Sequence, residues 1–304
     1  MTAERNIDAL AAQVPQWLGK HIAIRPLDGG ITNRNFVATV DGREFVLRVP
    51  GERTELLGID RANEAEASRR AESLGIAPPI VGELPETGTM ITQLVAGCHR
   101  EGDEFVRRLP DVVAMLRTFH DSAPLRGSFP IHRVVEWHAR DAASFGVEPP
   151  AMYHDLHRQS LRIEMAFNRA PVPLVPCHND LLPGNVLFDN HRAWLLDFEY
   201  AGMNDRFFDL GNLSINCGLS TSADVALIEM YLGTCSPMAL ARLNLMKVMS
   251  EFREGMWAVV QQAISTLDTD FVTYADQRLQ SCHRLTAVPE FEGWLDAAAH
   301  PMDG

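Results

Sequence analysis

The sequence predicts an α+β protein, in which a small strand-rich lobe, residues 1–97, precedes a larger and mainly helical lobe, residues 98–304. Two observations lead to this prediction. Up to Gly97, apolar residues come in short runs bounded by turn signals, which is typical of β-strands. After Gly97, they recur at three- and four-residue intervals over long segments, as on the buried face of a helix. A chain of 304 residues is long enough to give both lobes a core, and a cleft is expected between them.

The N-terminal lobe is expected to contain strands and one helix. Strand-like runs lie at residues 35–40, 44–49, 76–84 and 88–97. The first two flank Asp41-Gly42, a dipeptide that strongly favours a hairpin turn. Residues 61–75 are rich in Ala, Glu and Arg and end at Gly75, which predicts a helix stopped by glycine.

The C-terminal lobe is expected to be built from helices around one irregular region. Helical periodicity is found at residues 104–122, 152–170, 223–233 and 239–265. Pro110 lies inside the first of these segments and predicts a break in it. Between the second and third segments, residues 186–188 and 193–198 are expected to pair as a short hairpin.

Composition narrows the class of protein and its partners. The chain has 27 basic and 40 acidic residues, a net charge of −13, which argues against a nucleic-acid partner and is compatible with attracting a small cation. Its five cysteines are scattered and never spaced as CxxC, so neither a disulfide framework nor a zinc site is expected. No apolar run approaches the roughly 20 residues of a membrane-spanning helix, and the polar N-terminus does not have the pattern of a signal peptide. A cytoplasmic protein is expected.

The segment HNDLLPGN, residues 178–185, carries the strongest chemical signal. Asp180 follows His178 by two positions and precedes Asn185 by five, the spacing of a phosphoryl-transfer loop. A carboxylate at Asp180 can orient an attacking hydroxyl and accept its proton. The amide oxygen of Asn185 suits Mg²⁺. His178 is expected to hydrogen-bond to the backbone rather than to act as a base.

A second acidic group follows twelve residues after Asn185. Asp197 comes after an apolar strand and is expected to bind Mg²⁺ that bridges the phosphates of the donor. Glu199 would share the side of Asp197 if the extended backbone continued, and could hold a second metal ion or form a salt bridge on a loop. Asp209 precedes an expected helix, where it would cap that helix or brace the catalytic loop.

The residues that would bind the phosphate donor carry a weaker sequence signal. Gly29 and Gly30 precede Thr32, Asn33 and Asn35, and together they could close over phosphates. A plain turn between strands is the alternative, because the segment is neither a Walker A sequence nor GxGxxG.

The cation that grips the donor phosphates is expected to be an arginine. The chain has only two lysines, Lys20 and Lys247, whereas Arg48 lies on an expected strand. Glu64, with Glu66 as the alternative, is the expected ion-pair partner of Arg48, as in the strand-lysine to helix-glutamate pair of kinases. The planar guanidinium would reach the phosphates differently from a lysine.

These motifs together resemble the choline/ethanolamine kinase family, in particular its bacterial LicA-like branch, which has the protein-kinase-like two-lobe fold. GGITNRNF looks like the phosphate loop of the family, and FVLRVPG like its third strand. HNDLLPGN, LLDFEYAGMNDRFFDLGN and MWAVVQ are similar to its catalytic loop, metal-binding segment and Trp-containing helix. Aminoglycoside phosphotransferases share the HxDxxxxN loop, so they remain the alternative. The intact acidic motif disfavours a catalytically silent nucleotide-binding module.

The resemblance implies a kinase that uses ATP and Mg²⁺ to phosphorylate the hydroxyl of choline, ethanolamine or a similar small cationic alcohol. It assigns the following positions: the base Asp180; the metal ligands Asn185, Asp197 and Glu199; the adenine-contacting linker Gln93, Leu94 and Val95; the phosphate-side residues Gly30, Thr32, Asn33, Arg48 and Glu64; and the acceptor-pocket residues Tyr200 and Trp257.

The chain departs from the family pattern in the acceptor pocket. The family usually has a second Trp three positions before the one that matches Trp257, where this chain has Glu254, and a Glu where it has Asn216. Aromatic faces such as those of Tyr200 and Trp257 favour a quaternary ammonium. A carboxylate at Glu254 also suits a primary or secondary amine, which can donate hydrogen bonds to it. A plain core role is the alternative for Trp257.

Overall fold

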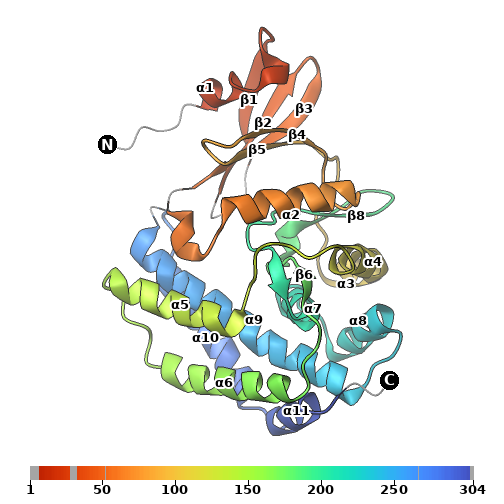
Figure 1. The fold of residues 1–304 in the computed structure, drawn as a ribbon, viewed down its shortest axis with the longest axis vertical. Coiled ribbons are helices and arrows are strands. Elements are labelled where there is room, and N and C mark those ends of the chain that lie inside the picture. Colours follow the sequence, from red (N-terminus) through yellow and green to blue (C-terminus); the bar gives the residue numbers. More distant parts are fainter. Residues whose placement is uncertain (1–6, 28–32, 52, 266, 302–304) are drawn as a thin grey trace.

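The computed structural model describes residues 7–27, 33–51, 53–265 and 267–301. It confirms the mixed α+β prediction, with an antiparallel sheet in the N-terminal part and a larger helical part after it (Figure 1). Gly29, Gly30 and Thr32 of the predicted phosphate loop lie outside the described residues.

The N-terminal sheet has five strands in the order β1-β2-β3-β5-β4, antiparallel throughout. The strands are β1 (Ile22–Leu27), β2 (Asn33–Val40), β3 (Arg43–Pro50), β4 (Ile80–Leu84) and β5 (Thr89–Gln93). The predicted turn between β2 and β3 is confirmed, because Asp41 and Gly42 both have positive φ, 51° and 75°. Strand β1 was not predicted. The short helix α1 (Ile7–Ala11) and Trp17 contribute to a small core with the sheet.

Helix α2 (Arg61–Ser73) connects the two parts of the molecule. It begins at Asp60, whose side chain accepts hydrogen bonds from the next turn, and it ends just before Gly75, which has a φ of 71°. Its buried residues Ala67 and Ala71 belong to the large core of the helical part. The helix therefore crosses beneath the sheet and packs onto the helices below it (Figure 1).

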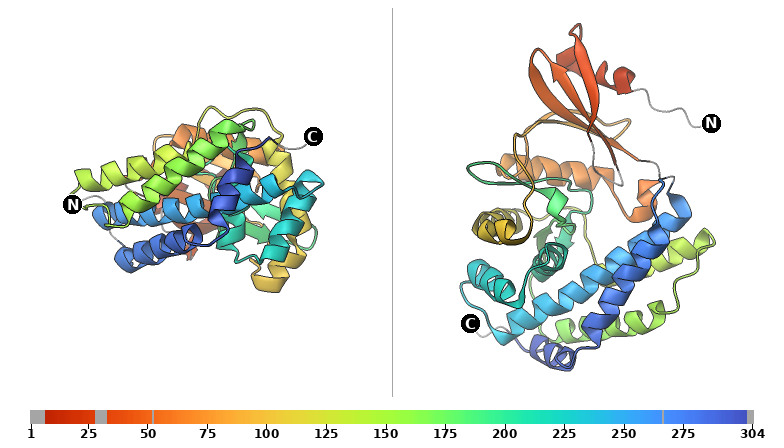
Figure 2. Two further views of the ribbon diagram at one scale, coloured as in Figure 1. Left: turned by 90° about the horizontal axis from the view of Figure 1, so that it is seen from below. Right: turned by 180° about the vertical axis from the view of Figure 1, so that it is seen from behind.

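The helical part is organised around α9 (Pro237–Ile264), a helix of 28 residues that is buried over most of its length. The other helices are α3 (Gly102–Arg107), α4 (Leu109–His120), α5 (Ile131–Ser144), α6 (Tyr153–Arg169), α7 (Arg206–Asn216), α8 (Thr221–Leu232), α10 (Phe271–Thr286) and α11 (Phe291–Ala298). Helices α5, α7, α10 and α11 pack against α9, and Figure 2 shows α10 alongside it. The break predicted at Pro110 is confirmed, since the chain leaves α3 at Arg108 and Pro110 is the second residue of α4.

Two short strand pairs hold the irregular region. β7 (Val186–Phe188) pairs with β8 (Ala193–Leu195), as predicted, and β6 (Val175–Cys177) pairs with β9 (Gly202–Asn204), which was not predicted. Residues 178–185 follow β6, and residues 196–201 join β8 to β9. The two acidic motifs are therefore carried by loops that are anchored at both ends.

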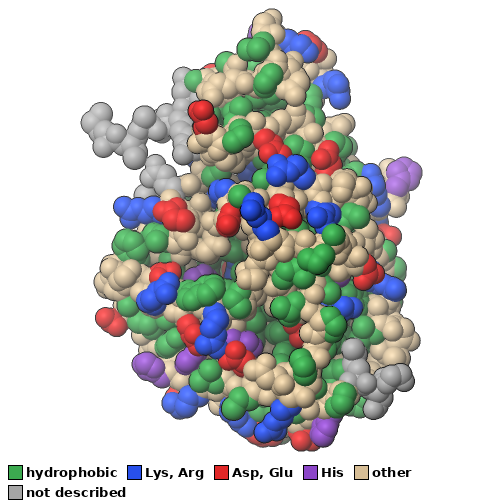
Figure 3. All heavy atoms as spheres, viewed as in Figure 1, with side chains coloured by type: hydrophobic (Ala, Val, Ile, Leu, Met, Phe, Trp, Pro, Cys, Tyr) green, Lys and Arg blue, Asp and Glu red, His purple; other side chains and the backbone are tan. Residues whose placement is uncertain are grey.

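Charges of both signs are interspersed on the face shown in Figure 3, so the acidic excess does not form one patch there. Ion pairs between surface side chains also occur, such as Arg69 with Glu83 at 2.7 Å. The five cysteines form no disulfide. In the part of the chain that the structure describes, no helix is long and apolar enough to span a membrane.

Candidate active site

A cleft of about 770 Å³ lies between the sheet and the helical part. β3, β5, the linker after β5, the two loops of the irregular region and α9 all contribute to its walls. The predicted site residues that line it are Arg48, Gln93, Leu94, Val95, Asp180, Asn185, Asp197, Glu199, Tyr200, Glu254 and Trp257. Asn33 and Glu64 lie behind this wall, where they contact Glu199 and Arg48. The fold thus brings the described candidates together.

Asp180 is held at the floor of this cleft by two side chains. Its Oδ1 accepts a hydrogen bond from Arg253 Nη1 at 3.0 Å, and its Oδ2 lies 3.3 Å from the donor Nδ2 of Asn185. The same nitrogen donates to the Asp180 carbonyl oxygen at 2.8 Å. Burial raises the pKa of Asp180 to about 6, although the Arg253 charge opposes this shift. The carboxylate is therefore mostly ionised at neutral pH and able to accept a proton.

His178 has the structural role that its sequence position predicts. Its Nε2 lies 2.9 Å from the carbonyl oxygen of Leu196, and its Nδ1 accepts a hydrogen bond from the Asp180 backbone N–H at 3.2 Å. The ring is buried and ties the catalytic loop to the segment that carries Asp197.

Of the two roles expected for Asp209, capping a helix or bracing the catalytic loop, the structure shows the second. Asp209 does not cap a helix, because it lies inside α7 and the cap is Asp205, which accepts a hydrogen bond from the Phe207 N–H at 3.0 Å. It does brace the catalytic loop: its carboxylate accepts from the backbone N–H groups of His178 and Asn179, at 2.8 and 2.7 Å.

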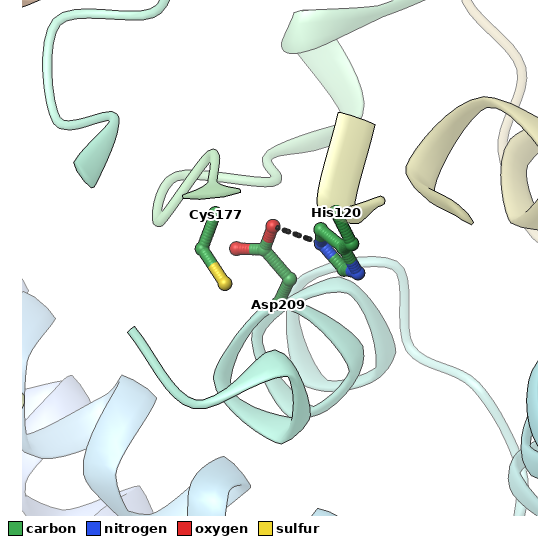
Figure 4. A group of neighbouring side chains, drawn as sticks. All are labelled: His120, Cys177 and Asp209. Atoms are coloured by element: carbon green, nitrogen blue, oxygen red, sulfur yellow. Dashed lines mark hydrogen bonds and ion pairs between the residues drawn. The ribbon is translucent and has the colours of Figure 1, made fainter. Parts of the chain in front are cut away.

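His120, Cys177 and Asp209 form a buried cluster under this loop, drawn in Figure 4. His120 Nε2 donates to Asp209 at 3.0 Å, while its Nδ1 lies 2.6 Å from the hydroxyl of Tyr231. Burial raises the pKa of the Cys177 thiol well above its usual range, so the sulfur stays protonated. With both ring nitrogens and both carboxylate oxygens already engaged, the cluster is an internal brace and not a metal site.

The backbone does not continue in an extended conformation at Asp197, so the condition under which Glu199 would share its side of the chain is not met. The φ of Asp197 is 64°, and the chain turns over residues 198–201. Both side chains nevertheless border the cleft. Glu199 is buried and accepts a hydrogen bond from Asn33 Nδ2 at 2.9 Å, with Arg61 at 3.7 Å. Burial and the neighbouring Asp197 raise the pKa of Glu199 to about 7.

Arg48 forms the predicted ion pair with Glu64 and also pairs with Asp197. The alternative partner, Glu66, lies instead 3.9 Å from Arg126. Arg48 therefore stands between the helix glutamate and one acidic residue of the second motif, on a strand that pairs with β5, and the linker after β5 borders the same cleft.

The opposite side of the cleft combines aromatic rings and charges. Trp257 Nε1 donates to the Tyr200 hydroxyl at 3.0 Å. Glu254 accepts hydrogen bonds from Tyr274 at 2.8 Å and from Arg253 at 2.7 Å. Trp257 is almost fully buried yet borders the cleft, so it serves the core and the cleft wall at once.

Sequence reasoning missed Arg253 and Tyr274. Arg253 stands next to Glu254 and four positions before Trp257, which places it on the Trp257 face of a helix, and this spacing could have revealed it. Tyr274 is on α10, and no motif singled it out. Asn216 is 3.5 Å from Arg278 and is not among the described residues that line the cleft.

A two-lobed α+β fold with an HxDxxxxN loop at the cleft defines a protein-kinase-like phosphotransferase. The model of the phosphotransferase enzyme family matches residues 23–241, and the chain belongs to this family. It is 30% identical over 299 residues to ethanolamine kinase 2 of Mus musculus, covering 86% of this chain and 75% of the relative. It is 25% identical to protein LicA of Haemophilus influenzae over 275 residues, covering 84% and 78%.

A solved structure supports the same placement. A choline/ethanolamine kinase family protein from Mesorhizobium loti has 32% identity and a TM-score of 0.84, and the similarity covers 96% of this chain and 98% of that one. The protein is a small-molecule kinase, a phosphotransferase with an alcohol group as acceptor.

Proposed function

We propose that the protein transfers the γ-phosphoryl group of ATP to the hydroxyl of choline, ethanolamine or a similar amino alcohol. One observation carries this proposal: Asp180 lines the same cleft as Arg48, the linker after β5 and a group of aromatic and carboxylate side chains. Residues 1–97 would form the nucleotide-binding lobe, and residues 98–304 the catalytic and acceptor-binding lobe.

On the donor side, the adenine would contact the linker formed by Gln93, Leu94 and Val95, which borders the cleft. The guanidinium of Arg48 would bind the phosphates, and its ion pair with Glu64 would keep it in position. A guanidinium presents several N–H groups in a fixed plane, so Arg48 can hold Glu64 and a phosphate oxygen at the same time.

The acidic residues fit Mg²⁺. Asn185 uses its amide nitrogen on Asp180, which leaves its carbonyl oxygen as the end that can bind a metal ion. Asp197 and Glu199 add carboxylate oxygens, and oxygen is the ligand that Mg²⁺ prefers. Burial, together with the negative charge of Asp197, raises the pKa of Glu199 to about 7, and a bound cation would offset that charge. Bound Mg²⁺ would neutralise charge on the phosphate oxygens during transfer.

On the acceptor side, Asp180 would orient the hydroxyl and take its proton. Tyr200 and Trp257 offer aromatic surface, and Glu254 offers a carboxylate, so the pocket suits a small alcohol that carries a positive nitrogen.

An ATP-consumption screen over amino alcohols, aminoglycosides and sugars tests the proposal, with products identified by mass spectrometry. Turnover is expected with the amino alcohols. Turnover with aminoglycosides alone would favour the other branch of the superfamily, and a protein that binds Mg-ATP without turnover of any acceptor would contradict the amino-alcohol assignment.

The variant Asp180→Asn tests the role of the base. Its turnover should fall by about 10²- to 10⁴-fold, the usual contribution of general-base catalysis, while nucleotide binding stays near that of the wild type. Asp103→Asn, an exposed change on α3, is the matched control and should keep full activity. A near-normal rate in Asp180→Asn would rule out the assignment of Asp180 as the base.

A further inference from the structure

We propose that Arg253 determines acceptor specificity: its guanidinium fills the cation position of the acceptor pocket, so that the site favours an amino alcohol whose nitrogen carries N–H groups over the trimethylated form. This inference rests on the proposed function, because it concerns the acceptor of the same site. It narrows the acceptor class from amino alcohols in general to those whose protonated nitrogen carries at least one N–H group.

The position of Arg253 is the first reason. The residue lies on α9, is 1% exposed and borders the cleft. Its guanidinium carbon stands 4.2 Å from the centre of the Tyr200 ring, well inside the roughly 6 Å over which a cation and an aromatic face attract. A second cation on that face would lose the contact with the ring and be repelled by the guanidinium.

The anchoring of Arg253 is the second reason. Its Nη1 donates to Asp180 at 3.0 Å and to Glu254 at 2.7 Å. Burial alone would lower its pKa, but the charges of Asp180 and Glu254 raise it, so the guanidinium is permanently charged. A substrate of the same charge cannot displace a cation that is fixed by two carboxylates and an aromatic ring.

Glu254 is the group left for the nitrogen of the acceptor. Each oxygen of its carboxylate already accepts one hydrogen bond, from Arg253 and from Tyr274. A carboxylate has about four acceptor sites, so an ammonium N–H can add to these. A trimethylated nitrogen has no N–H to donate, so its binding depends on contacts with aromatic faces. The face of Tyr200 that borders Arg253 is already occupied by the guanidinium.

The experiment compares kcat/KM for 2-aminoethanol and its mono-, di- and trimethylated forms, with ATP as donor. In the wild type, kcat/KM should fall by about tenfold or more from the unmethylated to the trimethylated acceptor, because a site built to bind N–H groups rejects an analogue that lacks them. In Arg253→Met, which uncovers the Tyr200 face beside two carboxylates, the ratio should shift by about tenfold towards the trimethylated form.

Two control variants separate this role from a structural one. Arg253→Lys keeps a charge at the position and should keep the wild-type order of acceptors. Arg242→Met removes an equally buried arginine of the same helix, which stacks on Phe167 at 4.0 Å and does not border the cleft, so it should leave the ratio unchanged.

The outcomes also distinguish this inference from the proposed function. If the wild type phosphorylates the series but accepts the trimethylated form as well as the others, the role of Arg253 is overturned and the proposed function stands. The same holds if Arg253→Met keeps the wild-type ratio. If no member of the series is phosphorylated, the proposed function fails and the inference fails with it. The wild-type series decides by itself should Arg253→Met not fold.

Discussion

The carboxylate of Asp209 is the point at which the fold fixes the catalytic loop, and the variant Asp209→Asn tests it. In the wild type, this fully buried side chain accepts three hydrogen bonds, from the backbone N–H groups of His178 and Asn179 and from His120. Burial alone would raise the pKa of Asp209, but His120 and His178 together lower it, so the group is charged in the folded protein. In Asp209→Asn, one of the two carboxylate oxygens is replaced by an NH₂ group, which then faces an N–H donor.

The size of the effect follows from these three bonds. Two of them keep an oxygen acceptor but lose the charge, which costs about 1 kcal/mol each. The third donor is left buried without a partner, which costs about 1–3 kcal/mol. The free energy of unfolding should therefore fall by about 3–5 kcal/mol, which is a large share of the roughly 5–15 kcal/mol that is typical of a folded protein. Because the loop also carries Asp180, a shift of about 1 Å should lower kcat by about 10²-fold.

Urea denaturation measures the first quantity, and steady-state kinetics with a separate nucleotide-binding titration measures the second. The exposed change Asp103→Asn should alter stability by less than about 0.5 kcal/mol and serves as the control. A loss of under about 1 kcal/mol together with an unchanged kcat in Asp209→Asn would refute the idea that this carboxylate holds the loop.

Three further predictions concern pH, packing and the donor site. Burial lowers the pKa of His138 from 6.5 to about 3, so the stability that its neutral form contributes is complete above pH 6.5 and is lost as the pH falls below it. Urea titrations at about pH 7.5 and pH 5 should show that the free energy of unfolding falls by about 2 kcal/mol between them. This fall should be absent in His138→Gln and retained in the control His283→Gln, which changes an exposed histidine. A matching slope in His138→Gln would contradict this. A Cβ on Gly211 would lie 2.9 Å from backbone atoms of α9, so Gly211→Ala should cost about 1–3 kcal/mol in the same assay, whereas Gly293→Ala, with open space around it, should not destabilise. Arg48→Ala should raise the KM for ATP by about tenfold or more and leave the KM for the acceptor unchanged; an equal rise in both would show that Arg48 acts on the fold rather than on the donor.

Local signals explain which elements could be predicted. The turn at Asp41-Gly42 and the break at Pro110 depend on the conformations that these residues themselves favour, and both were predicted correctly. The pairing of β6 with β9 could not be read in the same way. Each strand has three residues, and they are joined across the whole irregular region, so tertiary contacts decide whether they form.

The candidate site shows the same division. The spacing from His178 to Asn185 lies within one loop and could be read directly from the chain. The pairing of Arg253 with Asp180 joins positions 73 residues apart, and only the packing of α9 under the catalytic loop creates it. Whether the extended backbone continues past Asp197 could not be decided from the sequence, because an aspartate tolerates the left-handed region, and its φ of 64° turns the chain there.

The two arginines of the cleft each contact two carboxylates, but with different geometry. Arg48 uses Nη2 for Glu64 and Nη1 for Asp197, whereas Arg253 reaches both Asp180 and Glu254 through Nη1. Each guanidinium therefore links a carboxylate proposed to act in the reaction to a second carboxylate on a helix. A planar fork can hold two partners at fixed angles, as Arg48 does, while a lysine ammonium is a single point of charge on a flexible stem. A lysine in place of Arg48 would keep the charge but loosen one of the two carboxylates, so the geometry around Arg48 depends on the shape of the guanidinium as well as on its charge.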